Sequence, residues 1–197
     1  MPRGANVFGF AHADVTGDGA EDFVCFNRED YLQLYDAAGR EEWTSGERYG
    51  GKYEYLMTEE EYTLHNRESR AQRDPVPDDP QFIPQRVLLT DFDRDGKTEV
   101  FVVQNDDATG RLLTRVRAFR QGHFEALKWD NVGLTPIWRT RHFAGLISDY
   151  YVGDVDNDGM DELIFAVVKS VGDPVTGDAK TYLVSWKPQV GKKETPK

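Results

Sequence analysis

Short runs of apolar residues recur along the chain, and three of them directly follow an acidic loop. These runs, at 22–27, 99–104 and 162–168, are rich in β-branched and aromatic residues. Such side chains are favoured in strands, and an uninterrupted apolar run of this length is typical of a strand with both faces buried. The pattern therefore predicts three buried strands and an all-β fold.

Further segments alternate apolar and polar residues or end at a turn signal. Residues 31–35 alternate, residues 36–39 form a predicted turn, and a strand is expected over 41–45. The same reasoning predicts strands over 85–90, 112–119, 124–129, 136–140, 146–153 and 181–186. Each acidic loop is thus accompanied by about four short strands, which is the make-up of one blade of a β-propeller.

The three acidic loops share one spacing of residue types. They cover 14–22, 91–99 and 154–162, with oxygen-bearing side chains at loop positions 1, 3, 5 and 9 and glycine at position 6. Carboxylates this close together repel one another unless a cation joins them, and hard oxygen ligands in a flexible loop suit Ca²⁺. The glycine fits a sharp turn with positive φ, which a Cβ would disfavour. The loops are therefore predicted calcium sites.

The residues that follow each loop separate these sites from EF-hands. An EF-hand loop closes with a bidentate Glu at position 12 and continues into a helix. Here position 12 is apolar, as Cys25, Val102 or Phe165, and a strand is predicted to follow. A helical calcium-binding module is therefore not expected.

The combination of loop and following strand resembles the FG-GAP repeat of integrin-type β-propellers and the related bacterial VCBS repeat. In that family the loop lies between the first and second strands of each blade and holds one Ca²⁺. The resemblance implies an all-β partial β-propeller of about three four-stranded blades, the last one incomplete. The implied ligands are Asp14, Thr16, Asp18, Ala20 and Asp22 in the first loop, Asp91, Asp93, Asp95, Lys97 and Glu99 in the second, and Asp154, Asp156, Asp158, Met160 and Glu162 in the third, with Ala20, Lys97 and Met160 acting through their carbonyls.

One implied ligand departs from the pattern. Thr16 places a hydroxyl where the other two loops place a carboxylate, so the first loop carries one charge fewer. About three calcium sites are therefore expected, with the first one weakest.

The units are predicted to be unequal in length. The first blade is expected over 1–45, the second over 85–140 and the incomplete third over 141–190, with a polar tail at 191–197. Between the first two, residues 46–84 form a predicted insertion and linker, whose core is too charged and too rich in proline for a packed strand. A tolerated surface loop and a binding segment both fit that composition.

Three blades do not close a ring of the usual four to eight. We therefore expect one of three arrangements: further blades upstream of this chain, a second chain that completes the ring, or an open stack with protected edges.

Composition narrows the classes of function. The chain has 197 residues and a formal net charge of −11 at pH 7, so nucleic-acid binding, which needs basic patches, is not expected. No run approaches the ~20 apolar residues of a membrane span. No signal peptide is visible, yet proteins with these repeats are mostly exported. An extracellular, periplasmic or cell-surface location is expected, with a cytosolic one left open.

Other chemistry is sparse in the sequence. The motifs of serine hydrolases, zinc proteases, P-loops and dinucleotide sites do not occur. Cys25 is interpreted as a small buried hydrophobe. His12, His65, His123 and His142 share no metal-ligand spacing and are interpreted as surface or structural residues, while Tyr49, Tyr53, Tyr55, Tyr150 and Tyr151 either stack on a partner or pack between blades.

Two functions remain open. The first is a non-catalytic, calcium-stabilised scaffold that binds a protein or a glycan through its blade loops. The alternative is part of a polysaccharide-degrading enzyme built on or next to a propeller, in which a pair of carboxylates would do the chemistry. The absence of a catalytic constellation from the sequence favours the scaffold.

Overall fold

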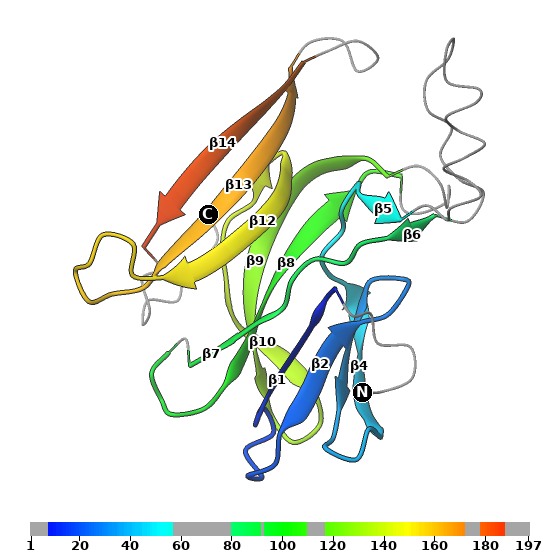
Figure 1. Cartoon of the computed structure of the whole chain (residues 1–197), viewed down its shortest axis with the longest axis vertical. Coiled ribbons are helices and arrows are strands. Elements are labelled where there is room, and N and C mark those ends of the chain that lie inside the picture. The colour runs from blue at the N-terminus through cyan, green and yellow to red at the C-terminus, as the bar shows by residue number, and fades with distance from the viewer. Residues whose placement is uncertain (1–7, 57–79, 92, 110–116, 172–177, 188–197) are drawn as a thin grey trace.

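A computed structural model describes residues 8–56, 80–91, 93–109, 117–171 and 178–187. Within these ranges the chain is all-β and forms no helix. Antiparallel pairing joins the strands into three larger sheets and one short ribbon (Figure 1). The ribbon pairs β5 (Tyr55–Leu56) with β6 (Gln81–Phe82), on either side of the central part of the predicted insertion, which lies outside the described residues.

The three larger sheets follow one another along the chain. The first sheet has the order β1 (Phe10–Ala13), β2 (Asp22–Phe26), β3 (Tyr31–Tyr35) and β4 (Glu41–Arg48). The middle sheet has the order β10 (Leu134–Arg139), β9 (Phe119–Trp129), β8 (Glu99–Asp107) and β7 (Leu88–Thr90), with β11 (Phe143–Ala144) pairing with β9. The third sheet has the order β12 (Leu146–Gly153), β13 (Glu162–Val171) and β14 (Asp178–Trp186).

Most of the predicted strands are confirmed, but the division at Gly122 is wrong. Separate strands were predicted over 112–119 and 124–129, whereas β9 runs through Gly122 without a break; residues 110–116 lie outside the described part of the chain. Gly122 serves as a close-packing position, since an added Cβ would lie 2.3 Å from Oδ1 of Asn105 on β8. A strand glycine of this kind marks close approach of a neighbour rather than a turn.

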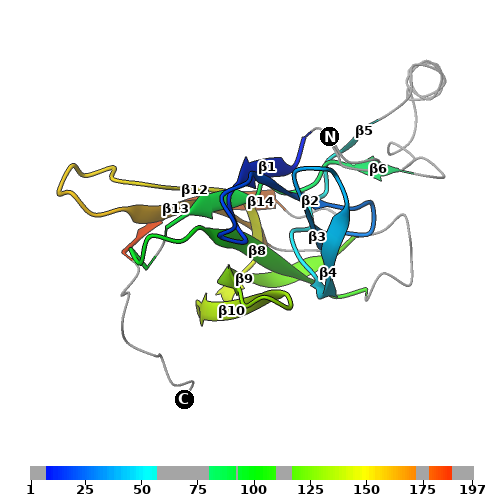
Figure 2. The same ribbon diagram turned by 90° about the horizontal axis from the view of Figure 1, so that it is seen from below.

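The middle sheet is covered on both faces, and β8 shows how. Val100 and Val102 belong to the core that is shared with the first sheet, whereas Phe101 and Val103 belong to the core shared with the third sheet. Successive side chains of a strand point to opposite faces, so a strand between two cores must be apolar at every position. This explains the unbroken apolar run of the sequence. Figures 1 and 2 show the first and third sheets on opposite sides of the middle sheet.

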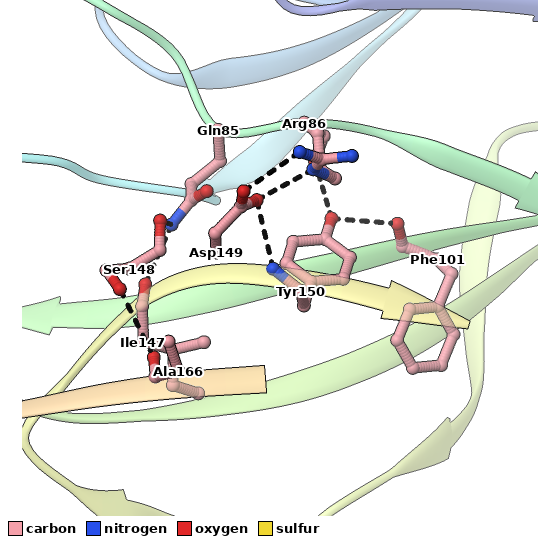
Figure 3. Close-up of polar contacts among 8 residues, drawn as sticks. All are labelled: Gln85, Arg86, Phe101, Ile147, Ser148, Asp149, Tyr150 and Ala166. Atoms are coloured by element: carbon pink, nitrogen blue, oxygen red, sulfur yellow. Dashed lines mark hydrogen bonds and ion pairs between the residues drawn. The ribbon is translucent and has the colours of Figure 1, made fainter. Parts of the chain in front are cut away.

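Polar contacts join the middle and third sheets beside the apolar core (Figure 3). Arg86 donates two hydrogen bonds to the carboxylate of Asp149, at 2.7 and 2.8 Å. The buried amide of Gln85 donates to the carbonyl of Ile147 at 2.7 Å. The hydroxyl of Tyr150, also buried, donates to the carbonyl of Arg86 at 2.5 Å, and the carbonyl of Phe101 lies 3.2 Å from the same hydroxyl. The segment that leads into β7 is therefore attached to β12 by specific contacts.

Each acidic loop connects the first and second strands of its sheet, namely β1 to β2, β7 to β8 and β12 to β13. Over the described residues the sheets do not close into a barrel or a ring. Cys25 on β2 is fully buried, which confirms its interpretation as a small core residue.

Candidate metal centres

The three acidic loops share a left-handed backbone conformation at the same glycine position. At loop position 6, Gly19, Gly96 and Gly159 have φ angles of 88°, 85° and 86°. These values confirm the prediction that the glycine occupies a turn with positive φ, a region that side chains with a Cβ rarely enter.

The same main-chain hydrogen bonds orient the carboxylates in all three loops. The position-6 amide donates to the position-1 carboxylate, at 3.0 Å for Asp14, 3.0 Å for Asp91 and 2.9 Å for Asp154. The position-7 amides of Ala20, Lys97 and Met160 donate to the position-5 carboxylates of Asp18, Asp95 and Asp158, at 2.8, 3.0 and 2.9 Å. These bonds hold one oxygen of each carboxylate in place.

In the second and third loops the carboxylates converge. One oxygen from each of Asp91, Asp93 and Glu99 lies within 4.8 Å of the others, and the same holds for Asp154, Asp156 and Glu162. Both position-9 glutamates are almost completely buried. A buried carboxylate beside two others is unfavourable unless positive charge compensates it. Each of these loops is therefore a cluster that can hold a metal ion.

A lysine supplies the compensating charge in each cluster. The Nζ atom of Lys128 lies 3.2 Å from Oε1 of Glu99 and 3.5 Å from Oδ2 of Asp93, and it also contacts Asp95. The hydrogen bond to Asp95 raises the pKa of Lys128 above its usual value, and the same bond lowers the pKa of Asp95. The ammonium thus binds where a metal cation would bind.

Lys187 has the same role in the third loop. Its Nζ lies 2.9 Å from Oδ2 of Asp156 and 3.2 Å from Oε1 of Glu162, and it also contacts Asp158. Hydrogen bonds to Asp158 and then Asp156 raise the pKa of Lys187. In both clusters, a lysine of the same chain therefore provides the positive charge.

Strand register explains why both lysines reach a loop. In the middle sheet Val100 pairs with Leu127, so the neighbouring residue Lys128 lies opposite Glu99. In the third sheet Leu163 pairs with Trp186, and Lys187 therefore follows opposite Glu162. Sequence reasoning missed both lysines, because only the pairing of the strands shows which residue faces position 9.

The first sheet has an acid at the corresponding place. Phe23 pairs with Tyr35, so Asp36 lies opposite Asp22. The carboxylate of Asp36 accepts hydrogen bonds from the main-chain N–H and the Nε of Arg40, at 2.8 and 2.7 Å. These bonds lower the pKa of Asp36, with the main-chain contact contributing most. The first loop therefore has no lysine at this register position.

The first loop also differs in its ligands. Oδ2 of Asp22 accepts the N–H groups of Val15 and Thr16, at 3.0 and 2.8 Å. The hydroxyl of Thr16 is buried without a hydrogen-bond partner. Three carboxylates do not converge in this loop as they do in the others, because its third position is a threonine. The Thr16 hydroxyl is thus available as an oxygen ligand, but less negative charge surrounds it than surrounds the third position of the other two loops.

The predicted aromatic and histidine residues divide between core and surface. Tyr49 and Tyr150 are buried between sheets, whereas Tyr53 and Tyr151 are exposed. Two of the histidines, which share no metal-ligand spacing in the sequence, are neighbours in space: the rings of His123 and His142 lie 4.5 Å apart between centroids. Strand pairing brings them together, and their spacing along the chain gave no sign of it.

Comparison with known proteins gives no relative on which to base a function. A scan against protein families found no match, and a search of the curated proteins found none either. Nor does the described part of the chain contain a helix long and apolar enough to cross a membrane. Functional inference therefore starts from the geometry of the loops.

Proposed function

We propose that this chain is a calcium-binding module of the FG-GAP/VCBS type, acting as a non-catalytic extracellular scaffold in a propeller-like assembly. The observation that carries the proposal is the convergence of carboxylates in the second and third loops on a point that already holds a positive charge. Loop conformation, the position of each loop between the first two strands of a sheet, and the stacking of the sheets all support it.

Calcium suits these clusters better than the ammonium group does. A lysine brings one charge and at most three hydrogen bonds, whereas Ca²⁺ brings two charges and takes about six to eight oxygen ligands. Lys187 is 44% exposed, so its long side chain is free to swing into solvent when the ion enters. Calcium binding would then release side-chain conformational entropy as well as neutralise the loop.

The need to displace a lysine weakens calcium binding at the second and third loops. The lysine is an intramolecular competitor at high local concentration. The apparent affinity for Ca²⁺ is therefore the intrinsic affinity multiplied by the fraction of time for which the ammonium is out of the loop. Sites of modest affinity fill at the millimolar calcium of extracellular fluids. We therefore favour an extracellular or surface location for the protein.

Two effects change the calcium affinity of the first loop in opposite directions. Thr16 removes one negative charge, which weakens calcium binding, but no lysine has to leave. The first site remains the weakest if the charge of the ligands dominates, and becomes the strongest if competition by lysine dominates. Titration of each loop in turn gives the order.

A protein partner fits the exposed surface of the third sheet better than a glycan does. Its outer face carries Tyr151 and Leu183, which are 57% and 79% exposed, beside half-buried Ile164. Since the middle sheet has both faces covered, we propose that another sheet, from a second copy of this chain, covers this face. Light scattering tests it: the proposal requires a dimer that Leu183→Lys converts to a monomer, and a monomeric wild-type protein at high concentration contradicts it.

Calcium binding is tested directly by thermal unfolding in EDTA, Ca²⁺ and Mg²⁺. A ligand that binds only the folded state stabilises it by about 2.7 kcal/mol per site at a hundredfold excess over Kd, and each kcal/mol raises the Tm by about 2–4 °C at this chain length. Asp156→Asn should remove part of the calcium-dependent increase. The matched control is Asp161→Asn, which makes the same charge change at an exposed loop position outside the predicted ligands. Equal Tm values in EDTA and 10 mM Ca²⁺ would exclude the proposal.

A further inference from the structure

A second kind of metal-ligating cluster lies on the middle sheet, away from the acidic loops. One ligand atom from each of Asp106, His123 and His142 lies within 4.8 Å of the other two. His123 is almost completely buried, whereas the side chains of Asp106 and His142 are 39% and 44% exposed. The cluster therefore has a buried side and a side that faces solvent.

Three adjacent strands bring these residues together. On β8 and β9, Gln104 pairs with His123, which places Asp106 diagonally across from His123 on the same face. On the other side of β9, Phe143 of β11 pairs with Gly122, so the preceding residue His142 lies next to His123. His123 is thus the central member of a row that crosses the sheet.

The hydrogen bonds of His123 leave one nitrogen for a ligand. Its Nε2 lies 3.0 Å from Oε1 of Glu125, and a carboxylate can only accept, so Nε2 carries the hydrogen. Nδ1 is buried without a hydrogen-bond partner. Since Nε2 is engaged by Glu125, Nδ1 is the nitrogen that remains to bind a metal. This nitrogen has no hydrogen-bond partner among the residues that the structure describes.

Glu125 is itself held firmly. The hydroxyl of Tyr49 donates to its Oε2 at 3.0 Å, and the guanidinium of Arg139 pairs with its Oε1. A histidine that binds metal through one nitrogen commonly donates its other N–H to a carboxylate that fixes the ring and increases its basicity. Glu125 is placed to do this for His123.

We propose that Asp106, His123 and His142 form a binding site for a divalent transition metal of the Zn²⁺ class. Two imidazoles and one carboxylate are ligands that Zn²⁺ accepts, and a mixed nitrogen and oxygen set is unsuited to Ca²⁺, which takes oxygen ligands. With three protein ligands, the solvent-facing side remains for water or an external ligand. The site is independent of the acidic loops and of the proposed calcium binding.

Small movements complete the ligand geometry. Nε2 of His142 lies 3.7 Å from Oδ2 of Asp106, and the amide of Gln121 donates to the same oxygen at 2.6 Å. Metal–nitrogen and metal–oxygen bonds are about 2.0–2.2 Å long, which allows ligand atoms to lie about 3–3.6 Å apart in a tetrahedral site. The partly exposed side chains of His142 and Asp106 have room to rotate toward such distances, whereas His123 is held by burial.

Cobalt(II) gives a direct test, because it replaces Zn²⁺ and its visible absorption strengthens when tetrahedral coordination by protein ligands replaces the octahedral water shell of the free ion. Protein that has been stripped with a chelator is titrated with Co²⁺ and then Zn²⁺, in 1 mM Ca²⁺ to occupy the acidic loops. The expected result is one equivalent of Co²⁺, displaced by Zn²⁺. His142→Ala and Asp106→Asn, both at partly exposed positions, should each weaken binding at least tenfold.

Two controls locate the metal. His12→Ala removes an exposed histidine that contacts Glu21 on the first sheet, and it should bind like the wild type. Asp156→Asn alters the third acidic loop, and its Co²⁺ titration should also be unchanged. Absence of cobalt absorption in the wild type would overturn the proposal. So would full-strength binding by both His142→Ala and Asp106→Asn, since the metal would then lie elsewhere.

Discussion

Nζ of Lys187 lies 3.2 Å from Oε1 of Glu162, at the point where the carboxylates of the third acidic loop converge. Glu162 is almost completely buried and comes from the start of β13, whereas Lys187 follows the end of β14. The contact therefore links the start of β13 to the residue after β14, at the end of the third sheet that carries the acidic loop. It also means that any metal ion must compete with a cation of the protein.

Removal of this lysine should strengthen calcium binding. We expect Lys187→Gln to lower the Kd of the third loop for Ca²⁺ by about tenfold, because the competing charge is gone and a tenfold change corresponds to about 1.4 kcal/mol. The measurement is isothermal titration calorimetry in low salt. Lys180→Gln is the matched control, with the same charge change at an exposed position on β14, the strand that Lys187 follows. An equal gain in both variants would point to net charge rather than to competition.

The Arg86–Asp149 pair should stabilise the fold only above the pH at which Asp149 protonates. Burial raises the pKa of Asp149, but the hydrogen bonds from Arg86 and from the N–H of Tyr150 outweigh this effect and lower it. A lowered pKa gives stability that is present above the unfolded value of about 3.9 and is lost as pH falls through the folded value. Both side chains are about half exposed, so we expect Asp149→Asn to lower the free energy of unfolding by up to about 1 kcal/mol at pH 7.

Urea unfolding of the wild type and Asp149→Asn at pH 7, 5 and 3 checks this expectation. The difference between the two proteins should persist at pH 5 and shrink at pH 3. A difference of the same size at all three pH values would show that the charge of Asp149 contributes nothing.

Phe101 should be among the most sensitive positions of the core. Its fully buried ring lies 5.7 Å from that of Phe124, 5.8 Å from that of Trp138 and 6.1 Å from that of Tyr150, between centroids. Phe101→Ala should lower the free energy of unfolding by about 3–5 kcal/mol, because it leaves a cavity between the middle and third sheets. Tyr151→Ala, at an exposed site, should cost about 0.5 kcal/mol or less. Similar losses in both variants, measured by chemical denaturation, would contradict the packing of these two sheets.

Cys25 should be unreactive in the folded protein. Burial, with a smaller contribution from Glu41, raises the pKa of its thiol to about 11, and the thiolate is the reactive form. At pH 8 we expect a disulfide reagent such as DTNB to modify it at least a hundredfold more slowly than in 6 M guanidinium chloride. A native rate close to the unfolded rate would show that β2 opens readily.

The same pKa shift has a consequence for stability. The folded state favours the protonated thiol, so this contribution is complete below the unfolded pKa of about 8.5 and is lost as pH rises through the folded value. Replacement of Cys25 by Ala should remove the part of the pH dependence of the free energy of unfolding that this thiol causes above pH 8.5. Around neutral pH, the slope of the free energy of unfolding against pH should be the same in both proteins.

Much of the fold was available from local patterns. The apolar runs after the acidic loops become buried strands, and the turn at 36–39 joins β3 to β4 as predicted. The glycine of each loop adopts the predicted positive φ. These features depend on residues close together in the chain, where steric limits and side-chain alternation act directly. The continuous strand through Gly122 was missed, because the reason for that glycine is the side chain of Asn105 on a neighbouring strand.

The candidate metal centres divide in the same way. The sequence by itself determined which acids share a loop, since their spacing and the turn bring them together. Only the tertiary structure decided that Lys128 and Lys187 complete two of the loops, and that Asp106 and His142 flank His123. Such partners are chosen by strand register, which depends on the hydrogen bonds and packing of whole sheets rather than on distance along the chain.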